Sequence, residues 1–468
     1  MSGPWQATFE KSCLRALFAG FASRAIQYAV LRNFHALPDS VGGRDIDILV
    51  APNDLAGAIG VLQDIADGSD LVAANWFEDE RIHQVTFVKW SETGSIAQIK
   101  IDLFTSGQLY GLEYLTPSRA LAGAQEHRGV SVVAPHVVIL DKWIFHLLVG
   151  QRLDPKYDAE FGAIAGQAED SLISGLAPVF GTARAADLVK ELVRCEGSSV
   201  KLSKFVRVAG FARLMLRKPL RSILNVTRFL GFRIKDRWRP HGLLVSISGP
   251  DGCGKTTVIE QLLEDLAVIF GEDVVTYHHF RPSVLPRIAS LAKRAGVIES
   301  VDENYEIPHR AEPSGLIGSM VRLGYYALDY TIGYWRRIRP RRQRREIVVY
   351  DRYHFELVAD PARSRIRLPN WLLLRAIRCL PRPGLAFYIK VDDEEVYRRK
   401  QELEPTRITE LNRRYWLMAD AGILEAVCND RAPGIAAREI LNTIVLSQGR
   451  GFAHALRGRS SRNTRGGA

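Results

Sequence analysis

The sequence predicts an α/β protein with more than one domain, and two strand patterns lead to this fold class. Over residues 241–446, short apolar runs such as LLVSIS alternate with stretches of helical spacing. This alternation is typical of a parallel sheet wrapped by helices. Near the N-terminus, RDIDILV alternates acidic and apolar residues, which predicts a strand with one polar face in an α+β domain. The length of 468 residues is enough for more than one core.

The distribution of charge predicts where the domains begin and end. Residues 1–200 carry 16 basic and 24 acidic side chains, residues 201–240 carry 12 basic side chains against Asp236 alone, and residues 241–468 carry 35 against 27. These changes predict a first domain with a helical extension over 1–200 and a basic amphipathic connector over 201–240. They also predict a second domain over 241–446 and a basic, disordered tail over 447–468.

Composition also predicts the cellular compartment. The sequence contains no run of about 18 uncharged apolar residues, so no membrane-spanning helix is expected. The N-terminus lacks a basic start followed by an apolar block, and the five cysteines have no paired spacing. We therefore expect a cytoplasmic protein without disulfide bonds or a zinc site.

The stretch GPDGCGKTT predicts a phosphate-binding loop. It follows the apolar run LLVSIS and precedes the helical stretch TTVIEQLLEDLAVIF. Glycines let successive backbone N–H groups turn toward one anion, and the helix that follows adds its positive N-terminal end. Lys255 is expected to reach the phosphates, and the Thr256 hydroxyl to hold Mg²⁺. The residues expected to bind the nucleotide are Gly249, Gly252, Gly254, Lys255, Thr256 and Thr257.

A second carboxylate is expected at the end of a neighbouring strand. The run REIVVYDRYHFE places Asp351 at the carboxyl end of an apolar strand, where open α/β sheets bind ligands. There Asp351 is expected to orient the metal, and Arg352 to meet a phosphate; the alternative for Asp351 is a strand-end cap. Basic side chains further along the sequence are expected to close over the transferring phosphate. The alternative is that they form a solvated helix face. They are Arg398, Arg399, Lys400 and Arg407, of which Arg399 is the preferred catalytic candidate.

Three segments are candidates for binding the acceptor. The strand DVVTYHHF runs into RPSVLP, so that Arg281 can hold an acceptor phosphate and His278 or His279 can contact the acceptor. DPARSRIRLP adds Arg363, Arg365 and Arg367. We assign His279, Arg281 and Arg363 to acceptor binding. The arginine-rich run over 336–345 is the third candidate segment. The alternative interpretation of this run is a solvated helix end.

The segments GPDGCGKTT and VVYDRYHFE, followed by the strand and helix of FYIKVDDEEVYRRKQ, occur in this order. Together they resemble the thymidylate kinase-like group of P-loop kinases over about residues 241–446. The resemblance implies a five-stranded parallel sheet like that of nucleoside-monophosphate kinases, with ATP and Mg²⁺ used to phosphorylate an acceptor. It also implies catalytic roles for Asp251, Asp351 and Arg352. The Arg-Glu-Pro-Gly-type segment that grips the nucleoside monophosphate in thymidylate kinases is missing. The acceptor therefore need not be thymidine monophosphate. The arrangement of the segments resembles thymidylate kinase-like proteins of bacterial surface-polysaccharide pathways, which implies a nucleotide, or a sugar or glycan of that metabolism, as the acceptor.

Paired acids characterise the N-terminal domain. Asp45 and Asp47 project from one face of a predicted strand, and AQIKIDLFTSG offers Asp102 on another strand. Such carboxylates repel each other unless a cation lies between them. The set resembles the polymerase-beta-type nucleotidyltransferase superfamily over about residues 20–160, which implies that Asp45 and Asp47 hold metals and Asp102 activates a hydroxyl. Leu31-Arg32-Asn33 stands where that superfamily has Gly-Ser. An active transferase, a ligand-binding relative and an acidic strand edge all remain open.

The connector and the partners complete the predictions. Residues 201–240 mix Arg and Lys with apolar residues, which fits packing between domains, contact with the inner face of the membrane, or nucleic-acid binding. No dedicated nucleic-acid-binding pattern is present. We expect an ATP- and Mg²⁺-dependent kinase with a small-molecule or glycan acceptor, and a homodimer is a further candidate assembly. Nucleotidyl transfer by the first domain and a non-catalytic ATP-binding adaptor at a membrane assembly are the alternatives.

Overall fold

The chain folds into two compact units. The computed structural model describes residues 4–42, 45–68, 71–79, 82–91, 95–238, 241–286, 315–401 and 404–463, with side chains up to residue 450. One unit comprises Met1–Lys235 with Val445–Ala468, and the other comprises Asp236–Ile444. The predicted connector therefore belongs mostly to the first unit. Its residues 239–240, and residues 464–468 of the predicted tail, lie outside the described residues.

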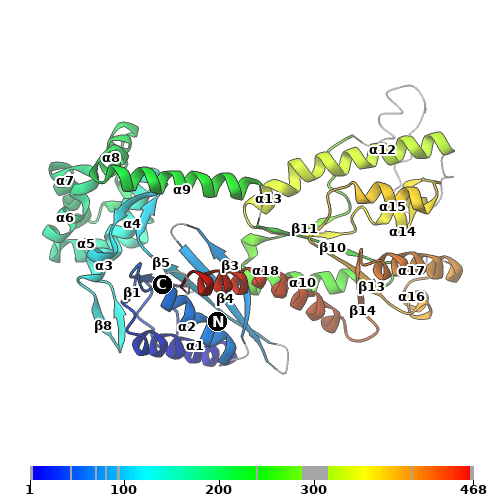
Figure 1. The fold of residues 1–468 in the computed structure, drawn as a ribbon, viewed down its shortest axis with the longest axis horizontal. Helices are drawn as coiled ribbons and strands as arrows, with labels where there is room; N and C mark the ends of the chain where they lie inside the picture. The colour runs from blue at the N-terminus through cyan, green and yellow to red at the C-terminus, as the bar shows by residue number, and fades with distance from the viewer. Residues whose placement is uncertain are drawn as a thin grey trace. The chain divides into compact units, whose positions relative to one another are not determined.

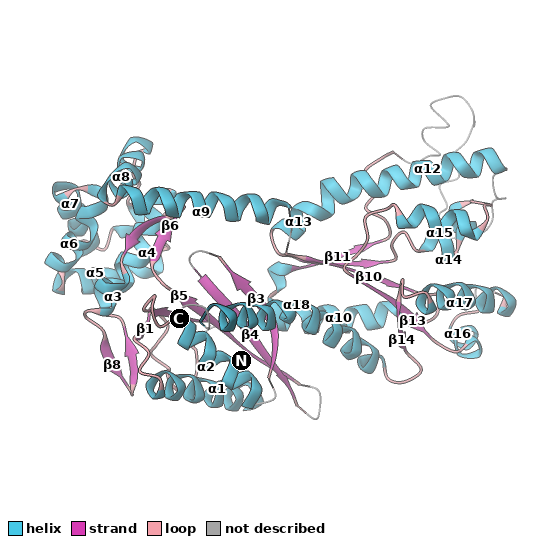
Figure 2. Ribbon diagram, in the orientation of Figure 1, coloured by secondary structure: helices cyan, strands magenta, loops and turns pink. Residues whose placement is uncertain are grey.

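The first unit is built on a mixed sheet, drawn in magenta in Figure 2. Its described strands follow the order β3-β4-β5-β2-β1-β9-β8. They are β1 Tyr28–Val30, β2 Asp45–Val50, β3 Val72–Glu78, β4 Ile82–Trp90, β5 Ile96–Phe104, β8 Gln125–His127 and β9 Val130–Val132. A separate hairpin pairs β6 Gly107–Leu109 with β7 Leu112–Leu115. The central strands β2 and β5 are parallel, and Asp47 lies opposite Asp102.

Helices pack on this sheet because the side chains of its strands point alternately to its two faces. Ile46, Ile48 and Ile101 join a core with α1 Pro4–Ser23 and α2 Leu55–Gly68. Leu49 and Phe104, on the opposite face, join a second core with a helical layer. That layer and its neighbours are α3 Pro117–Leu121, α4 Pro135–Val149, α5 Asp158–Gln167, α6 Glu169–Phe180, α7 Thr182–Val193, α8 Lys204–Arg217 and α9 Pro219–Trp238. The side-chain period of two therefore directs the acidic face toward the helical layer.

The second unit contains the expected five-stranded parallel sheet. Its order is β11-β12-β10-β13-β14, and all four neighbouring pairs are parallel. The strands are β10 Leu243–Ser248, β11 Val275–His279, β12 Ile347–Asp351, β13 Leu385–Lys390 and β14 Glu425–Cys428. Every residue of β10 and β12 is buried. Central strands buried on both faces give the continuous apolar runs seen in the sequence.

Helices cover both faces of this sheet (Figure 1). Leu244, Val348 and Tyr388 face a core shared with α12, α15 and α17. The alternate residues face the side on which Figure 1 shows α10 and α18. The helices are α10 Lys255–Phe270, α12 Leu316–Gly333, α13 Arg339–Gln343, α14 Glu356–Ala359, α15 Asn370–Arg378, α16 Asp393–Arg399, α17 Pro405–Asp420 and α18 Pro433–Asn463.

The C-terminal tail differs from the prediction of disorder. Helix α18 continues to Asn463 and so includes most of residues 447–468. Its first turns are anchored by buried Ala437, Ile440 and Ile444, and extending a nucleated helix costs little free energy per residue. No helix among the described residues is long and apolar enough to span a membrane.

Candidate functional site

The predicted phosphate loop joins β10 to α10 with left-handed glycines. Gly252 has φ +92° and Gly254 has φ +83°. A Cβ atom at Gly252 would lie 3.0 Å from Lys400 Cβ and 3.1 Å from the carbonyl oxygen of Val396. The loop thus has its curled shape only because glycine has no side chain at these positions. Thr256 and Thr257 are exposed at the start of α10.

Lys255 lies folded against this loop. Its side chain is buried, and Nζ donates hydrogen bonds to the carbonyl oxygens of Gly249 at 2.9 Å and Pro250 at 2.8 Å. Asp251 Oδ1 lies 4.0 Å from the same ammonium group. The charge of Lys255 is thereby held at the mouth of the loop, where the loop amides and the N-terminus of α10 also favour an anion.

Asp351 takes the predicted position at the end of β12. Parallel pairing sets it beside Ile247 of β10 and His279 of β11. Asp351 Oδ2 lies 2.8 Å from His279 Nδ1, whereas Oδ1 is buried and accepts no hydrogen bond from the described residues. A buried carboxylate oxygen without a partner is costly unless a ligand satisfies it. Asp351 is therefore suited to a hydrated Mg²⁺ ion.

Arg352 organises a buried ionic network behind the loop. Its Nη1 donates to Glu356 Oε2 at 2.9 Å, its Nη2 contacts Asp251 Oδ1, and Tyr415 donates to Glu356 Oε1 at 2.6 Å. Burial raises the pKa of Asp251, but the charges of Arg352, Lys255, Arg363 and Lys400 outweigh burial and lower it below its usual value. Asp251 therefore stays ionised. The sequence analysis did not identify Glu356 or Tyr415, because neither role has a local sequence signal.

The loop, the strand end and the cations enclose one cavity of about 410 Å³. Its lining includes all the predicted catalytic residues. They are Asp251, Gly252, Gly254, Lys255, Thr256, Thr257, His279, Phe280, Asp351, Arg352, Arg363, Arg399 and Lys400. Arg399 is oriented by Glu395 Oε1 at 2.8 Å and by the carbonyl oxygen of Asn429 at 3.4 Å. We call this the phosphate cavity.

A second cavity, also of about 410 Å³, has a different lining. Tyrosines from α12 and from the segment after β12 combine with two predicted acceptor residues, Arg281 and Arg363. The full lining is Phe280, Arg281, Ser283, Tyr326, Tyr330, Arg352, Tyr353, Glu356, Leu357, Arg363 and Ser364. We call this the aromatic cavity. It shares Phe280, Arg352 and Arg363 with the phosphate cavity.

Arg281 is held in the aromatic cavity by its neighbours. Its guanidinium carbon lies 4.5 Å from the centre of the Tyr326 ring, and Nε lies 3.7 Å from Asp329 Oδ2. Asp329 is buried, and its other oxygen accepts hydrogen bonds from the backbone N–H groups of Val284 and Leu285 at 2.9 Å each. Helix α12 thus contributes both a wall of the cavity and the carboxylate that orients Arg281.

Several residues predicted for the site lie outside the cavity expected for them. His279 lines the phosphate cavity and not the aromatic cavity, so its placement differs from the acceptor role assigned to it. Arg407 pairs with Asp360 at 2.6 Å. Neither Arg365 nor Arg367 lines the two cavities. In the basic run over 336–345, Arg342 bonds the Gly242 carbonyl and the Tyr334 hydroxyl, which is a structural role.

In the first unit, the three predicted acids share one face of the sheet as expected, and two cations of the chain lie beside them. Lys100 Nζ lies 3.4 Å from Asp45 and 3.7 Å from Asp102, and Arg32 Nε lies 2.5 Å from Asp47. Burial, more than the neighbouring charges, raises the pKa of Asp102 to about 6. Within the described ranges, no three acidic, histidine or cysteine side chains are grouped to hold a metal. Asp45, Asp47 and Asp102 form ion pairs with Lys100 and Arg32, while Asp102 Oδ1 is buried and accepts no hydrogen bond from the described residues.

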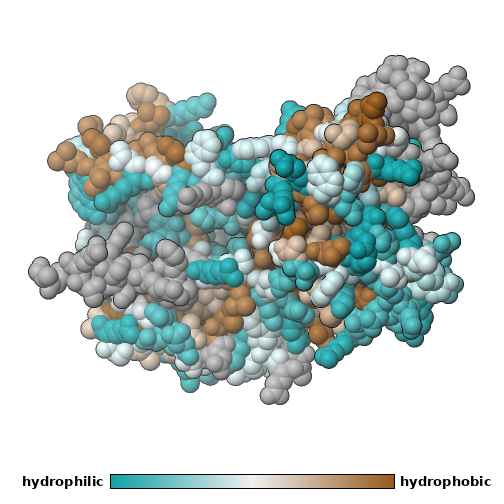
Figure 3. All heavy atoms as spheres, turned by 45° about the vertical axis from the view of Figure 1, so that its right-hand side comes forward, coloured by the Kyte–Doolittle hydropathy of each residue, from teal (hydrophilic) through white to brown (hydrophobic). Residues whose placement is uncertain are grey.

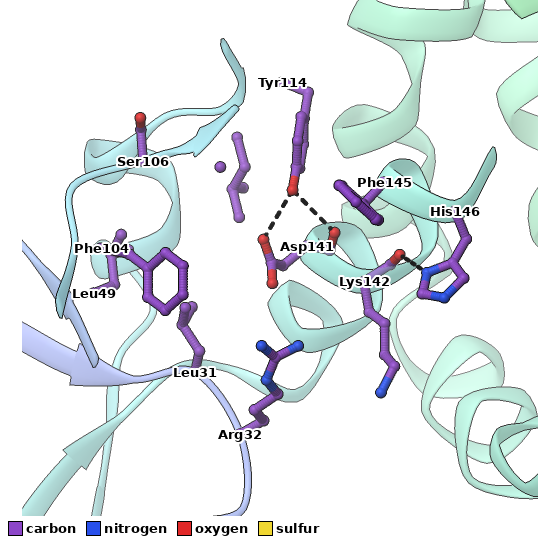
Figure 4. A pocket seen from close by; sticks show the side chains of 12 residues that line it. Leu31, Arg32, Leu49, Phe104, Ser106, Tyr114, Asp141, Lys142, Phe145 and His146 are labelled. Atoms are coloured by element: carbon purple, nitrogen blue, oxygen red, sulfur yellow. Dashed lines mark hydrogen bonds between the residues drawn. The ribbon is translucent and has the colours of Figure 1, made fainter. Parts of the chain in front are cut away.

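A small cavity of about 170 Å³ adjoins these acids (Figure 4). Arg32 points into it from the end of β1, and Asp141, Lys142 and His146 line it from α4. Tyr114 donates a hydrogen bond to Asp141 Oδ1 at 3.2 Å. The Lys142 ammonium lies 3.7 Å from the centre of the Tyr157 ring. Arg32 thus lines this cavity and also pairs with Asp47.

Comparison with known proteins adds little to this description. No family model matches the chain. Among solved structures, thymidylate kinase from Ehrlichia chaffeensis aligns with 17% sequence identity and a TM-score of 0.30. The alignment covers 43% of this chain and 98% of the Ehrlichia chain. A similarity of this strength does not establish a shared chemistry.

Proposed function

We propose that the second unit is an ATP- and Mg²⁺-dependent kinase for a small acceptor. The observation that carries the proposal is the pair of adjoining cavities. One is lined by a glycine loop, a lysine and a strand-end aspartate, and the other by aromatic rings and arginines. Phe280, Arg352 and Arg363 line both. Two sites that share cations suit the transfer of a phosphoryl group between two bound molecules.

The residues of the phosphate cavity fit a magnesium nucleotide. The left-handed glycines leave room for phosphate oxygens, and Lys255 supplies a positive charge. The unsatisfied oxygens Asp351 Oδ1 and Ser248 Oγ are buried at the ends of β12 and β10. Mg²⁺ would neutralise phosphate charge there, with Thr256 and Asp351 as its protein contacts. Arg352, Arg363 and Arg399 would stabilise charge on the transferred group.

The lining of the aromatic cavity supports an acceptor that has both a ring and an anionic group. Tyr326, Tyr330 and Tyr353 offer flat apolar surfaces, and Arg281 and Arg363 offer cations. This combination suits a molecule with a ring and an anionic group, such as a nucleotide or a phosphorylated sugar. A glycan of surface-polysaccharide metabolism belongs to the same class. The acceptor oxygen would form a new bond to the terminal phosphorus as the bond to the bridging oxygen breaks, releasing ADP.

The first test is acceptor-dependent release of ADP by the full chain. A panel of nucleoside monophosphates, sugar phosphates and oligosaccharides is incubated with ATP and Mg²⁺, and products are detected by mass. Lys255→Met should reduce turnover by at least 100-fold, whereas Lys156→Met should leave it unchanged. Lys156 is a matched control because it is exposed and forms its ion pair with nearby Asp154 at 3.0 Å. Equal turnover in Lys255→Met and the native protein would contradict the proposal.

The same measurements separate the alternatives. ATP binding without turnover for any acceptor would favour a nucleotide-binding adaptor. Release of pyrophosphate that disappears in Asp45→Asn/Asp47→Asn would favour nucleotidyl transfer by the first unit. The kinase is preferred because Lys100 and Arg32 already form ion pairs with the acids of the first unit.

A further inference from the structure

Helices α8 and α9 of the first unit have one covered face and one uncovered face. Along α9, the less exposed residues recur at helical spacing and contact their own unit. They are Ser222, Asn225, Val226, Phe229 and Phe232. Phe229 packs against Tyr110 with ring centres 5.8 Å apart, and Phe232 lies 6.5 Å from Phe77. These contacts fix which side of α9 faces away from the unit.

The uncovered side of both helices is apolar. On α9, Leu220, Ile223, Leu224, Leu230 and Ile234 recur at spacings of three, four and seven, and each is at least 49% exposed. On α8, Phe205, Val208, Met215 and Leu216 repeat the pattern, and Phe205 is 83% exposed. A monomeric soluble protein rarely exposes a large contiguous apolar patch, and each of these two helices carries an exposed apolar stripe. In Figure 3, brown apolar atoms lie beside teal polar atoms at the upper left of the face that is drawn.

Basic side chains flank this stripe. Residues 204–235 contain nine Lys and Arg and no Asp or Glu. On a helical wheel, Arg221, Arg228 and Lys235 lie along one border of the α9 stripe, seven residues apart, and Arg233 lies beyond the other border. Arg228, Arg233 and Lys235 are exposed. An apolar stripe with basic borders is the pattern of a helix that lies in the interface of an anionic membrane.

We infer that the uncovered face of α8 and α9, over residues 204–235, binds an anionic lipid surface. The second unit of the same chain offers no opposite net charge as a competing occupant, since residues 236–444 carry 32 Lys and Arg against 28 Asp and Glu. The stripe consists of aliphatic and phenylalanine side chains, which enter the acyl boundary of a bilayer and offer no hydrogen bonds to bases. This inference does not depend on the proposed kinase activity.

Co-sedimentation of the full chain with vesicles tests the inference. Vesicles of phosphatidylcholine with about one third phosphatidylglycerol should bind the protein at least tenfold more strongly than pure phosphatidylcholine. Arg228→Glu/Lys235→Glu should weaken binding by at least 20-fold, since each basic residue near an anionic surface contributes roughly a fivefold factor. Leu220→Gln/Ile234→Gln should also weaken it at least tenfold. Leu328→Gln is the apolar control, because Leu328 is similarly exposed on α12.

Three outcomes would overturn the inference. The first is no binding to anionic vesicles, and the second is binding that the α9 variants leave unchanged. The third is tighter retention by duplex DNA than by vesicles, lost in the same variants, which would assign the face to nucleic acid. Hydrogen exchange of residues 219–235 with and without vesicles gives a second measurement. Slowing of exchange only with anionic vesicles supports the inference, and equal protection without them contradicts it.

Discussion

Replacing Tyr415 by Phe removes one hydroxyl from the network behind the phosphate loop. Tyr415 is fully buried, and its hydroxyl donates to Glu356 at 2.6 Å. Burial, and next the charge of Glu356, raises the pKa of Tyr415 well above its usual value. A hydrogen bond to a charged group contributes about 1.5–3 kcal/mol. Because the buried oxygen of Glu356 cannot gain water easily, Tyr415→Phe should lower the free energy of unfolding of the second unit by about 2 kcal/mol.

Tyr388 provides a matched control for this change. It stacks on Tyr415 with ring centres 5.0 Å apart and planes 10° apart, and its hydroxyl donates to Asn412 at 2.6 Å. Both Phe variants keep the stacked rings, but Tyr388→Phe loses a hydrogen bond to a neutral amide. A neutral hydrogen bond contributes about 1 kcal/mol. The difference between the variants therefore isolates the charge of Glu356.

The free energies can be measured by urea unfolding of the full chain. Hydrogen exchange of peptides from α17 and β13 follows the second unit separately, because two units need not unfold together. The expected order is native protein, then Tyr388→Phe, then Tyr415→Phe. Equal losses, or a larger loss in Tyr388→Phe, would refute the assignment of a charged network to Glu356 and Tyr415.

Three further predictions concern the same unit. Gly252→Ala should weaken ATP binding at least tenfold in calorimetry, because a Cβ at φ +92° would press on Lys400; unchanged affinity would contradict the loop geometry. Asp329→Asn keeps an acceptor for the backbone N–H groups but removes the charge beside Arg281, and should raise the acceptor KM about tenfold, or about 1.4 kcal/mol, with little change in kcat. Burial lowers the pKa of His354 to about 3. Below the ordinary histidine pKa of about 6.5, His354 takes up a proton in the unfolded state but stays neutral in the folded state. The contribution of neutral His354 to stability is therefore complete above about pH 6.5 and is lost as the pH falls. His354→Leu should reduce the slope of unfolding free energy between pH 6 and 4 by about 1.4 kcal/mol per pH unit; parallel curves would refute this.

The local sequence was sufficient where chemistry depends on neighbouring residues in the chain. The loop over 249–256, the strand end at Asp351 and the shared face of Asp45 and Asp47 follow from glycine, apolar runs and alternation. Each of these patterns acts within about ten residues, so the backbone geometry of one turn or strand expresses it. The parallel sheet was predicted from the alternation of apolar runs and helical stretches over residues 241–446 and from the resemblance to P-loop kinases.

Other features depend on contacts between distant segments. Tyr415 reaches Glu356 across 59 residues, and Arg352 contacts Asp251 across 101 residues. No spacing in the sequence reveals such pairs, because only packing decides which side chains meet.

The first unit shows the same division. The sequence by itself placed Asp45 and Asp47 on one face of a strand, since a strand has a side-chain period of two. Only the tertiary structure decided which cations pair with them, because strand pairing set Lys100 opposite Asp45 and folding brought Arg32 to Asp47. Likewise, composition made residues 204–235 basic and apolar, whereas packing of Phe229 and Phe232 against the unit decided which face stays uncovered. Local patterns fix the direction of a side chain, and long-range packing fixes its partner.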